Sequence, residues 1–357
     1  MKKINGLWMI FLIAIFWVVS VTAQNKVSSN KAQLLYEQGY QLMMQTKLKE
    51  AINCFDQALA VDSTHLLSWC YKGAAFILLD EWDKALSTFD TALKLNKNCI
   101  FALGGRGRAL DKLNKKTEAK EIFEQVDKIQ SQDSNIFAYM GRGYAHTGQK
   151  KYNEAIQDYT KVINLDSKLA WAYSHRGYAN SEQGIYDMAI TDYTKAIQLY
   201  PQFAEAYLNR GFAYKKRGNF DLAIKDYNAA LIINPEFSYA YNNRGGVYYS
   251  QGKYNLAIED YNAAIEFFPK FAFAYINRGN AYNALGNYGS ALADYTKAIE
   301  INPQDASFYL YRGNTYYMRE EFNSAKRDWQ KAIELDSGGG MGDEAQKNLQ
   351  KLQKLGY

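Results

Sequence analysis

Apolar and small residues recur along this chain at positions that repeat every 34 residues. In the repeat 204–237 they occupy positions 4, 8 and 11, and then positions 17, 20, 24 and 27. Steps of three and four residues place each set on one face of a helix. Every repeat therefore predicts two amphipathic helices, one after the other.

Glycine and proline predict where these helices end. A glycine near position 15 closes the first helix, because it adopts the left-handed conformation most easily, and a proline at position 32 stops the second. The glycines are Gly184, Gly218, Gly252 and Gly286, and the prolines are Pro201, Pro235, Pro269 and Pro303. One such hairpin cannot bury both of its apolar stripes, so the repeats are expected to stack around a continuous core.

An Arg-Gly pair at positions 7 and 8 marks six consecutive repeats without a slip in spacing. These repeats are 136–169, 170–203, 204–237, 238–271, 272–305 and 306–339. Three diverged repeats precede them at 32–65, 66–99 and 100–133, followed by a two-residue insertion. The pattern therefore predicts nine repeats, three diverged over 32–133 and six regular over 136–339.

The repeat 204–237 also carries a set of residues at fixed offsets. They are Tyr207, Gly211, Tyr214, Ala223, Tyr227, Ala230 and Pro235. On these residues the chain resembles the tetratricopeptide repeat (TPR) family. The resemblance implies an all-α fold, a right-handed superhelical solenoid of helix-turn-helix repeats whose first helices line a concave groove. The arginine at position 7 departs from the family, which usually has an apolar residue there.

The C-terminal end predicts one more helix. GGGMG at 338–342 breaks the period, and residues 340–357 then follow with a single apolar face. That face holds Ala345, Leu349, Leu352 and Leu355. The pattern favours a helix that caps the last repeat, and the alternative is a free tail that binds a partner.

Residues 1–23 have the features of a secretory signal. Two lysines precede an apolar run over residues 7–21, and Ala23 is a small residue at the expected cleavage site. We therefore expect an exported bacterial protein, periplasmic or secreted, with a short disordered lead-in at 24–31. The alternative is an uncleaved segment 7–21 that anchors the chain in the inner membrane, and it is the one membrane tether that the sequence suggests.

Charge and cysteine content narrow the range of functions. The formal net charge of +5 is too small to predict a nucleic-acid groove. The cysteines are Cys54, Cys70 and Cys99. A bridge between Cys54 and Cys70 is conceivable in an exported chain, and buried free thiols are favoured over it.

Residues that would carry catalysis or bind a metal do not come together in the pattern. The histidines are His65, His146 and His175, and they occupy unrelated repeat positions, so no metal site is predicted. The sequence contains neither a nucleophile elbow nor a phosphate loop. We therefore predict no catalytic residues, no cofactor and no enzymatic activity.

The arginine at position 7 puts a charge into an apolar stripe, and an aspartate at position 23 accompanies it in all six regular repeats. The pairs are Arg142 with Asp158, Arg176 with Asp192, Arg210 with Asp226, Arg244 with Asp260, Arg278 with Asp294, and Arg312 with Asp328. A buried arginine needs a carboxylate or a route to water, so these residues predict a structural ladder of ion pairs. Pairing within a repeat is favoured over pairing with the next repeat. Arg106 breaks the pattern, because Ile122 stands at its position 23.

Positions 2, 6, 9 and 13 share one face of the first helix, which the resemblance assigns to the concave side. Position 6 holds Asn209, Asn243 and Asn277, whose amides can donate and accept hydrogen bonds along the backbone of an extended peptide. Positions 2 and 9 hold aromatic rings that can form pockets for apolar side chains. They are Trp171, Tyr178, Phe212, Tyr239 and Phe273, with Phe137 and Tyr144 in the fourth repeat.

The predicted function is a non-enzymatic interaction scaffold or assembly adaptor whose partner is a protein or peptide. Two alternatives remain open for the aromatic residues. The rings at position 2 can fill gaps between adjacent helices, or rings and amides together can bind a glycan.

Overall fold

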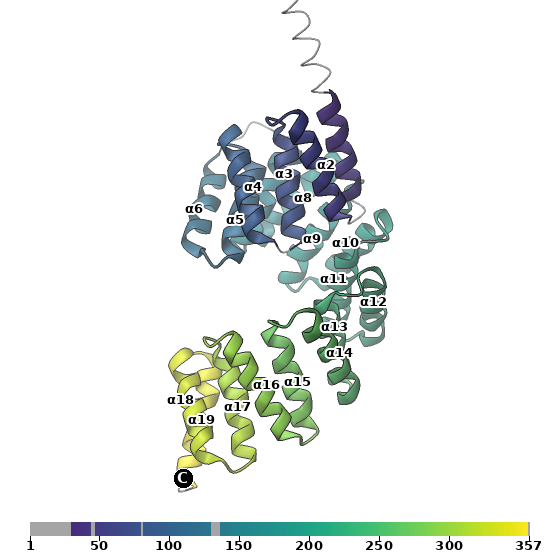
Figure 1. Ribbon diagram of the computed structural model, residues 1–357. Coiled ribbons are helices and arrows are strands. Elements are labelled where there is room, and N and C mark those ends of the chain that lie inside the picture. Colours follow the sequence, from purple (N-terminus) through teal and green to yellow (C-terminus); the bar gives the residue numbers. More distant parts are fainter. Residues whose placement is uncertain (1–29, 44–46, 80, 130–135, 356–357) are drawn as a thin grey trace, which may run out of the picture. The chain divides into compact units, whose positions relative to one another are not determined.

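The computed structural model describes residues 30–43, 47–79, 81–129 and 136–355. Within these ranges all regular secondary structure is helical, and consecutive helices form pairs joined by short turns (Figure 1). The chain divides into two compact units, residues 1–203 and residues 204–357, which we call the N-terminal and the C-terminal unit. Each unit is a stack of helical hairpins.

The N-terminal unit holds the first five repeats. Its helices are residues 30–43, α2 (Leu48–Val61), α3 (Leu66–Leu78), α4 (Trp82–Leu95), α5 (Ile100–Lys112), α6 (Lys116–Lys128), α7 (Ile136–Gly148), α8 (Tyr152–Leu165), α9 (Ala170–Glu182) and α10 (Tyr186–Leu199).

The C-terminal unit holds the last four repeats and a final helix. Its helices are α11 (Ala204–Lys216), α12 (Phe220–Ile233), α13 (Ser238–Ser250), α14 (Tyr254–Phe267), α15 (Ala272–Ala284), α16 (Tyr288–Ile301), α17 (Ala306–Met318), α18 (Phe322–Leu335) and α19 (Gly340–Lys354). Adjacent first helices contact one another, whereas each second helix contacts mainly the first helices of its own and the next repeat. The first helices therefore lie closer together, which makes their side of this unit the concave side.

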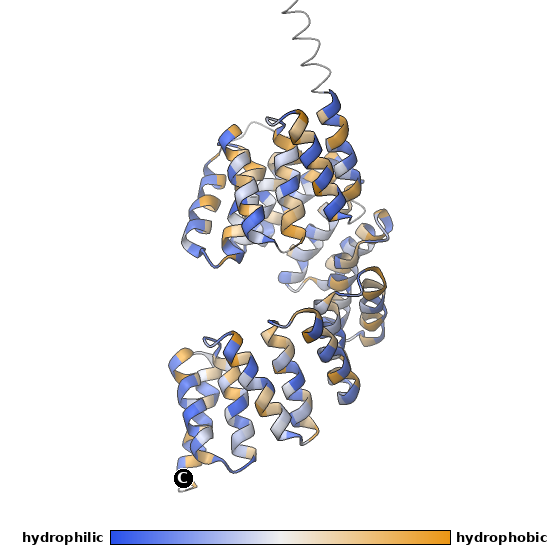
Figure 2. Cartoon of the chain, in the orientation of Figure 1, coloured by the Kyte–Doolittle hydropathy of each residue, from blue (hydrophilic) through white to orange (hydrophobic). Residues whose placement is uncertain are grey.

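The second helix of each repeat supplies much of the core. In the repeat 204–237, Ala223, Tyr227 and Ala230 are fully buried. Gly211 of the first helix lies against the tyrosine ring, since a Cβ atom on this glycine would lie 2.8 Å from the ring of Tyr227. Burial of such a ring contributes roughly 2 kcal/mol. Figure 2 shows the alternation of hydrophilic and hydrophobic residues along the helices that this packing requires.

The predicted glycine turns are confirmed. The φ angles are +77° at Gly184, +77° at Gly218, +73° at Gly252 and +75° at Gly286. Asn114, Lys150 and Glu320 adopt the same left-handed conformation at position 15 of repeats that lack the glycine. The hairpin geometry is therefore common to these repeats, and glycine only makes the turn easier.

Regular stacking changes around the two-residue insertion. Here α7 packs closely on α5, because glycines remove the side chains where the two helices cross. A Cβ atom on Gly104 would overlap the carbonyl group of Gly141, and a Cβ atom on Gly141 would overlap the carbonyl group of Ile100. The glycine-rich stretch in α5 thus serves close helix packing.

The last helix, α19, covers the final repeat. Ala345, Leu349 and Leu352 are buried in a cluster that includes Trp329. Leu355 was expected on the same face, but it is 61% exposed, because α19 ends at Lys354 and the packed face ends with it. The helix therefore caps the array and is not a free tail.

The first described helix begins at residue 30, so residues 30 and 31 are helical and not part of a disordered lead-in. A hydrogen bond of 2.9 Å from the Gln33 amide to the Glu37 carboxylate supports the first turns of this helix. The predicted signal at 1–23 and the rest of the lead-in lie outside the described residues. Within the part of the chain that the structure describes, no helix is both long and apolar enough to cross a membrane.

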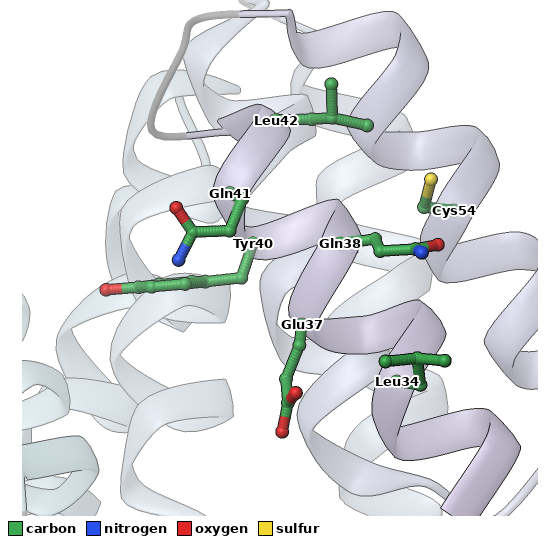
Figure 3. A pocket seen from close by; sticks show the side chains of 7 residues that line it. All are labelled: Leu34, Glu37, Gln38, Tyr40, Gln41, Leu42 and Cys54. Atoms are coloured by element: carbon green, nitrogen blue, oxygen red, sulfur yellow. The ribbon is translucent and has the colours of Figure 1, made fainter.

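An open hollow of about 640 Å³ lies at the first hairpin (Figure 3). Its lining includes Leu34, Gln38 and Cys54, at repeat positions 3, 7 and 23. Leu34 is 56% exposed, whereas its counterpart in a later repeat, Ala206, is fully buried. The hollow therefore marks the uncovered end of the first hairpin, where no earlier hairpin packs among the described residues.

The cysteines are free thiols, and the pair within hydrogen-bond distance is Cys70 and Cys99, not the Cys54 and Cys70 of the alternative bridge. The Sγ atoms of Cys70 and Cys99 lie 3.8 Å apart, because Cys70 in α3 faces the residue that precedes α5. Cys54 instead borders the hollow at the first hairpin. The hydrogen bond from the Cys70 thiol lowers the pKa of Cys99 to about 7, against the opposing effect of burial.

Oxidised glutathione is therefore expected to link Cys70 to Cys99. The half-buried Cys99 thiolate attacks the reagent, and the buried Cys70 thiol then displaces glutathione from the mixed disulfide. Peptide mapping without reduction should find this bridge, while Cys70→Ser should leave glutathione on Cys99. A bridge that contains Cys54 would contradict the geometry.

Candidate functional site

The position-7 arginines and the position-23 aspartates meet within each regular repeat. In the last five repeats, the Nε and Nη2 atoms of the arginine donate to both carboxylate oxygens at 2.6–3.0 Å. In the fourth repeat, Arg142 donates from Nε to Asp158 at 3.5 Å, and His146 also hydrogen-bonds to this carboxylate. The aspartate side chains are nearly buried, and the arginine side chains are only slightly more exposed.

The same arginines also reach the preceding repeat. The Nη1 atom of Arg176 donates to Thr160 at 3.1 Å, and Nη1 of Arg278 donates to Asn262 at 2.6 Å. Arg244 and Arg312 make the equivalent bonds to Asn228 and Thr296. Each of these acceptors stands at position 25. One guanidinium therefore joins the two helices of its own hairpin and ties that hairpin to the one before it, a link that the sequence analysis did not predict.

The diverged repeats use a different carboxylate. Arg106 donates to Asp90 at 2.7 Å, and Lys72 pairs with Asp56 at 2.6 Å. Both aspartates stand at position 25 of the preceding repeat. Arg106, which lacks an aspartate at position 23 of its own repeat, therefore pairs with the preceding repeat, because position 25, which holds threonine or asparagine in the first five regular repeats, carries an acid here.

At one of these pairs, burial of the carboxyl group and the charge of its partner act on its pKa in opposite directions. At the pair of Arg244 and Asp260, burial raises the pKa of the Asp260 carboxyl, although the hydrogen bonds and the charge of Arg244 oppose this effect. The guanidinium of Arg244 also lies 5.5 Å from the ring centre of Tyr241, a cation–π contact. The ladder is thus part of the scaffold, and its charges are not available to a ligand.

Several concave-side positions of the N-terminal unit are filled by rings that pack against one another. Tyr71, Phe101, Tyr144, His175 and Trp171 form a chain of contacts with ring centres 5.1–6.0 Å apart. Trp171 is only 8% exposed, so its ring packs within the unit and is not accessible to a partner. Burial lowers the pKa of His175 to about 3 and keeps it neutral within this cluster.

The other aromatic candidates are more accessible. Tyr178 is 39% exposed, Tyr239 is 43% exposed and Phe273 is 53% exposed. Phe212 is half-buried, and the Lys216 ammonium lies 5.3 Å from its ring centre. The structure does not describe the side chain of Phe137. Apart from Tyr178, the accessible rings therefore belong to the C-terminal unit.

The three asparagines at position 6 are all half-buried on α11, α13 and α15. Asn277 donates to the side chain of Asn242 at 2.9 Å. Asn209 and Asn243 make no side-chain hydrogen bond to another described residue, so their amides are available to a partner.

Among the described residues, no group of three or more histidines, cysteines and acids could hold a metal ion. The chemistry that the concave side of the C-terminal unit offers is instead that of amides and aromatic rings.

Comparison with known families identifies the repeat. The tetratricopeptide repeat family matches residues 204–237 and 272–305, residues 294–334 and residues 102–133. A second description, TPR repeat, matches residues 143–184, 181–218 and 245–286. These matches cover more than half of the chain, and the chain belongs to the tetratricopeptide repeat family.

Solved structures agree with this fold. One chain of the crystal structure of the APC/C hetero-tetramer Cut9–Hcn1 is 16% identical in sequence. The match covers 89% of this chain and 76% of that chain, with a TM-score of 0.59. A tetratricopeptide repeat protein from Parabacteroides merdae is 22% identical over 71% of this chain and 98% of that chain, with a TM-score of 0.52. At these identities the likeness shows the fold alone, an all-α TPR solenoid. No curated protein matches the sequence.

TPR proteins are generally scaffolds without enzymatic activity that bind proteins or peptides. The family and the fold therefore support a role as a protein-interaction scaffold.

Proposed function

We propose that this chain is an exported interaction scaffold that binds an extended segment of a protein partner along the concave side of its C-terminal unit. The observation that carries the proposal is the difference between the units. Trp171 is buried among other rings in the N-terminal unit, whereas Tyr239 and Phe273 are about half exposed on the first helices of the C-terminal unit.

The amides beside these rings suit the backbone of a peptide. Asn243 lies on α13 with Tyr239, and its side chain has no partner among the described residues. An amide can donate to a peptide carbonyl group and accept from a peptide N–H, while an exposed ring covers an apolar side chain. A glycan is a weaker candidate, because Trp171, the largest ring of that alternative, is not accessible.

Export rests on the sequence of residues 1–23 alone and remains part of the proposal. Mass spectrometry of the protein from a bacterial periplasmic fraction would test it, since cleavage after Ala23 should yield a chain that begins at Gln24.

A random dodecapeptide library displayed on phage would test the binding face. Peptides selected by the purified chain should bind Tyr239→Ala/Phe273→Ala at least about tenfold more weakly, because aromatic anchors carry much of the energy of such contacts. Ile232→Ala is the matched control, since Ile232 is 83% exposed on α12, a second helix. Equal affinity for the double variant and the natural chain would refute the proposal.

A further inference from the structure

Lys215 on α11 is a half-buried cation without a counter-ion. It makes no hydrogen bond or ion pair to any described residue. Burial, together with the charge of Lys216, lowers the pKa of Lys215, and no carboxylate opposes this effect. The position-7 arginines of the same unit, by contrast, each have an aspartate. A cation held partly out of water is favoured when an anion joins it.

The Lys215 ammonium lies over a gap in the neighbouring helix. Gly246 stands at position 9 of α13, and a Cβ atom there would lie 2.8 Å from Nζ of Lys215 and 3.9 Å from the hydroxyl of Tyr261. The ammonium and the hydroxyl thus converge on the space above a residue that has no side chain.

The next two repeats show what is missing at this point. Asn280 at position 9 accepts a hydrogen bond from the Tyr295 hydroxyl at 2.8 Å, and Asn314 accepts one from the Trp329 indole at 2.8 Å. Gly246 offers no such acceptor, and the Tyr261 side chain makes no hydrogen bond to a described residue. Two donors, one of them charged, therefore face a space without an acceptor.

We propose that this space binds the carboxylate of an aspartate or glutamate side chain in the partner's extended segment. A carboxylate has two oxygens and one negative charge, so it can accept from both Lys215 and Tyr261 and neutralise the single cation. The site lies beside α13, the helix that carries Tyr239 and Asn243. The inference rests on the proposed function, because it names one side chain of the peptide that this face binds.

The same dodecapeptide library tests the inference when it is selected against three proteins. The natural chain and Lys216→Met should both select peptides that carry an acidic residue at a fixed distance from an apolar one. Lys215→Met should select peptides without this acidic preference. Lys216→Met is the matched control, because it removes the same charge from the next residue of the same helix. A selected peptide should lose roughly tenfold or more in affinity for the natural chain when its acid becomes the amide, and little for Lys215→Met.

Gly246→Asn provides a second variant that fills the site from within. Its amide oxygen should accept from Tyr261 as Asn280 does from Tyr295, so acidic peptides should bind it more weakly while its melting temperature does not fall. Lys215→Met should melt no earlier than the natural chain, because it removes an uncompensated charge.

The outcomes separate the two proposals. If no peptide is enriched by the natural chain, the proposed function fails. If peptides are enriched without an acidic preference, or if Lys215→Met keeps that preference, the carboxylate site is overturned and the binding face remains. Loss of the preference in both lysine variants would point to the general positive charge of the face and would also overturn the site.

Discussion

Arg244→Leu is expected to destabilise the C-terminal unit by about 3 to 5 kcal/mol near neutral pH, because it leaves the Asp260 carboxylate buried without its partner. The Asp260 side chain is only 7% exposed, and both of its oxygens accept from Arg244. Burial already raises the pKa of Asp260, and the hydrogen bonds and charge that oppose this rise come from Arg244. Urea denaturation followed by circular dichroism would measure the loss.

The loss should depend on pH in a defined direction. Without the arginine, the folded-state pKa of Asp260 rises further above its unfolded value, so the folded state binds a proton more readily. The destabilisation is then full above the folded pKa and shrinks as the pH falls through it. A loss of stability that stays constant between pH 7 and pH 4 would contradict a stranded carboxylate.

A double-mutant cycle separates the interaction energy of Arg244 with Asp260 from the effects of each residue on its other neighbours. Arg244→Leu/Asp260→Leu should be more stable than the sum of the single losses predicts, because no charge is left unpaired. Lys297→Leu provides the control, since Lys297 and Glu300 pair on the surface at 2.8 Å, and it should change stability little. Simple additivity of the two single variants would mean that the ladder does not couple these residues.

The features that the sequence predicted correctly all depend on residues that are close together in the sequence. Helix pairs, glycine turns and the pairing of positions 7 and 23 all lie within one hairpin, whose geometry repeats every 34 residues. Positions 7 and 23 also change together along the chain, which points to a contact without any knowledge of the stacking.

Contacts between hairpins were harder to predict. Asp90 and Asn262 at position 25 look like ordinary surface residues, and only the stacked structure brings them to the arginine of the next repeat. A comparison of position 25 with position 7 of the following repeat could have revealed the link. Burial of Trp171 depends on how closely successive first helices approach, which the sequence of one repeat does not specify.

The binding face raises the same difficulty. Asn209, Asn243 and Asn277 could be placed on one helical face by counting residues. The donors Lys215 and Tyr261 lack an acceptor because Gly246 of α13, toward which both point, has no side chain. A glycine in the sequence does not show which neighbouring side chains surround it. The structure of the stacked helices shows the space above the glycine and the donors that line it.

Gly141→Ala is expected to cost the N-terminal unit about 3 kcal/mol or more, because the added methyl group meets the main chain and not a flexible side chain. Its Cβ atom would overlap the carbonyl group of Ile100 at the contact of α7 with α5. The two helices would have to separate, and the aromatic cluster that joins Phe101 to Tyr144 would open with them. Loss of cooperative melting and early proteolysis between α5 and α7 would report this opening.

Gly289→Ala is the matched control for this change. Gly289 lies near the start of α16, and nothing lies within 4 Å of a Cβ atom built on it. Alanine favours a helix over glycine by up to about 1 kcal/mol, so this variant should be as stable as the natural chain or more stable. If Gly141→Ala were also neutral, the glycines of α5 and α7 would not set the distance between these helices, and the filled concave-side positions of the N-terminal unit would need another cause.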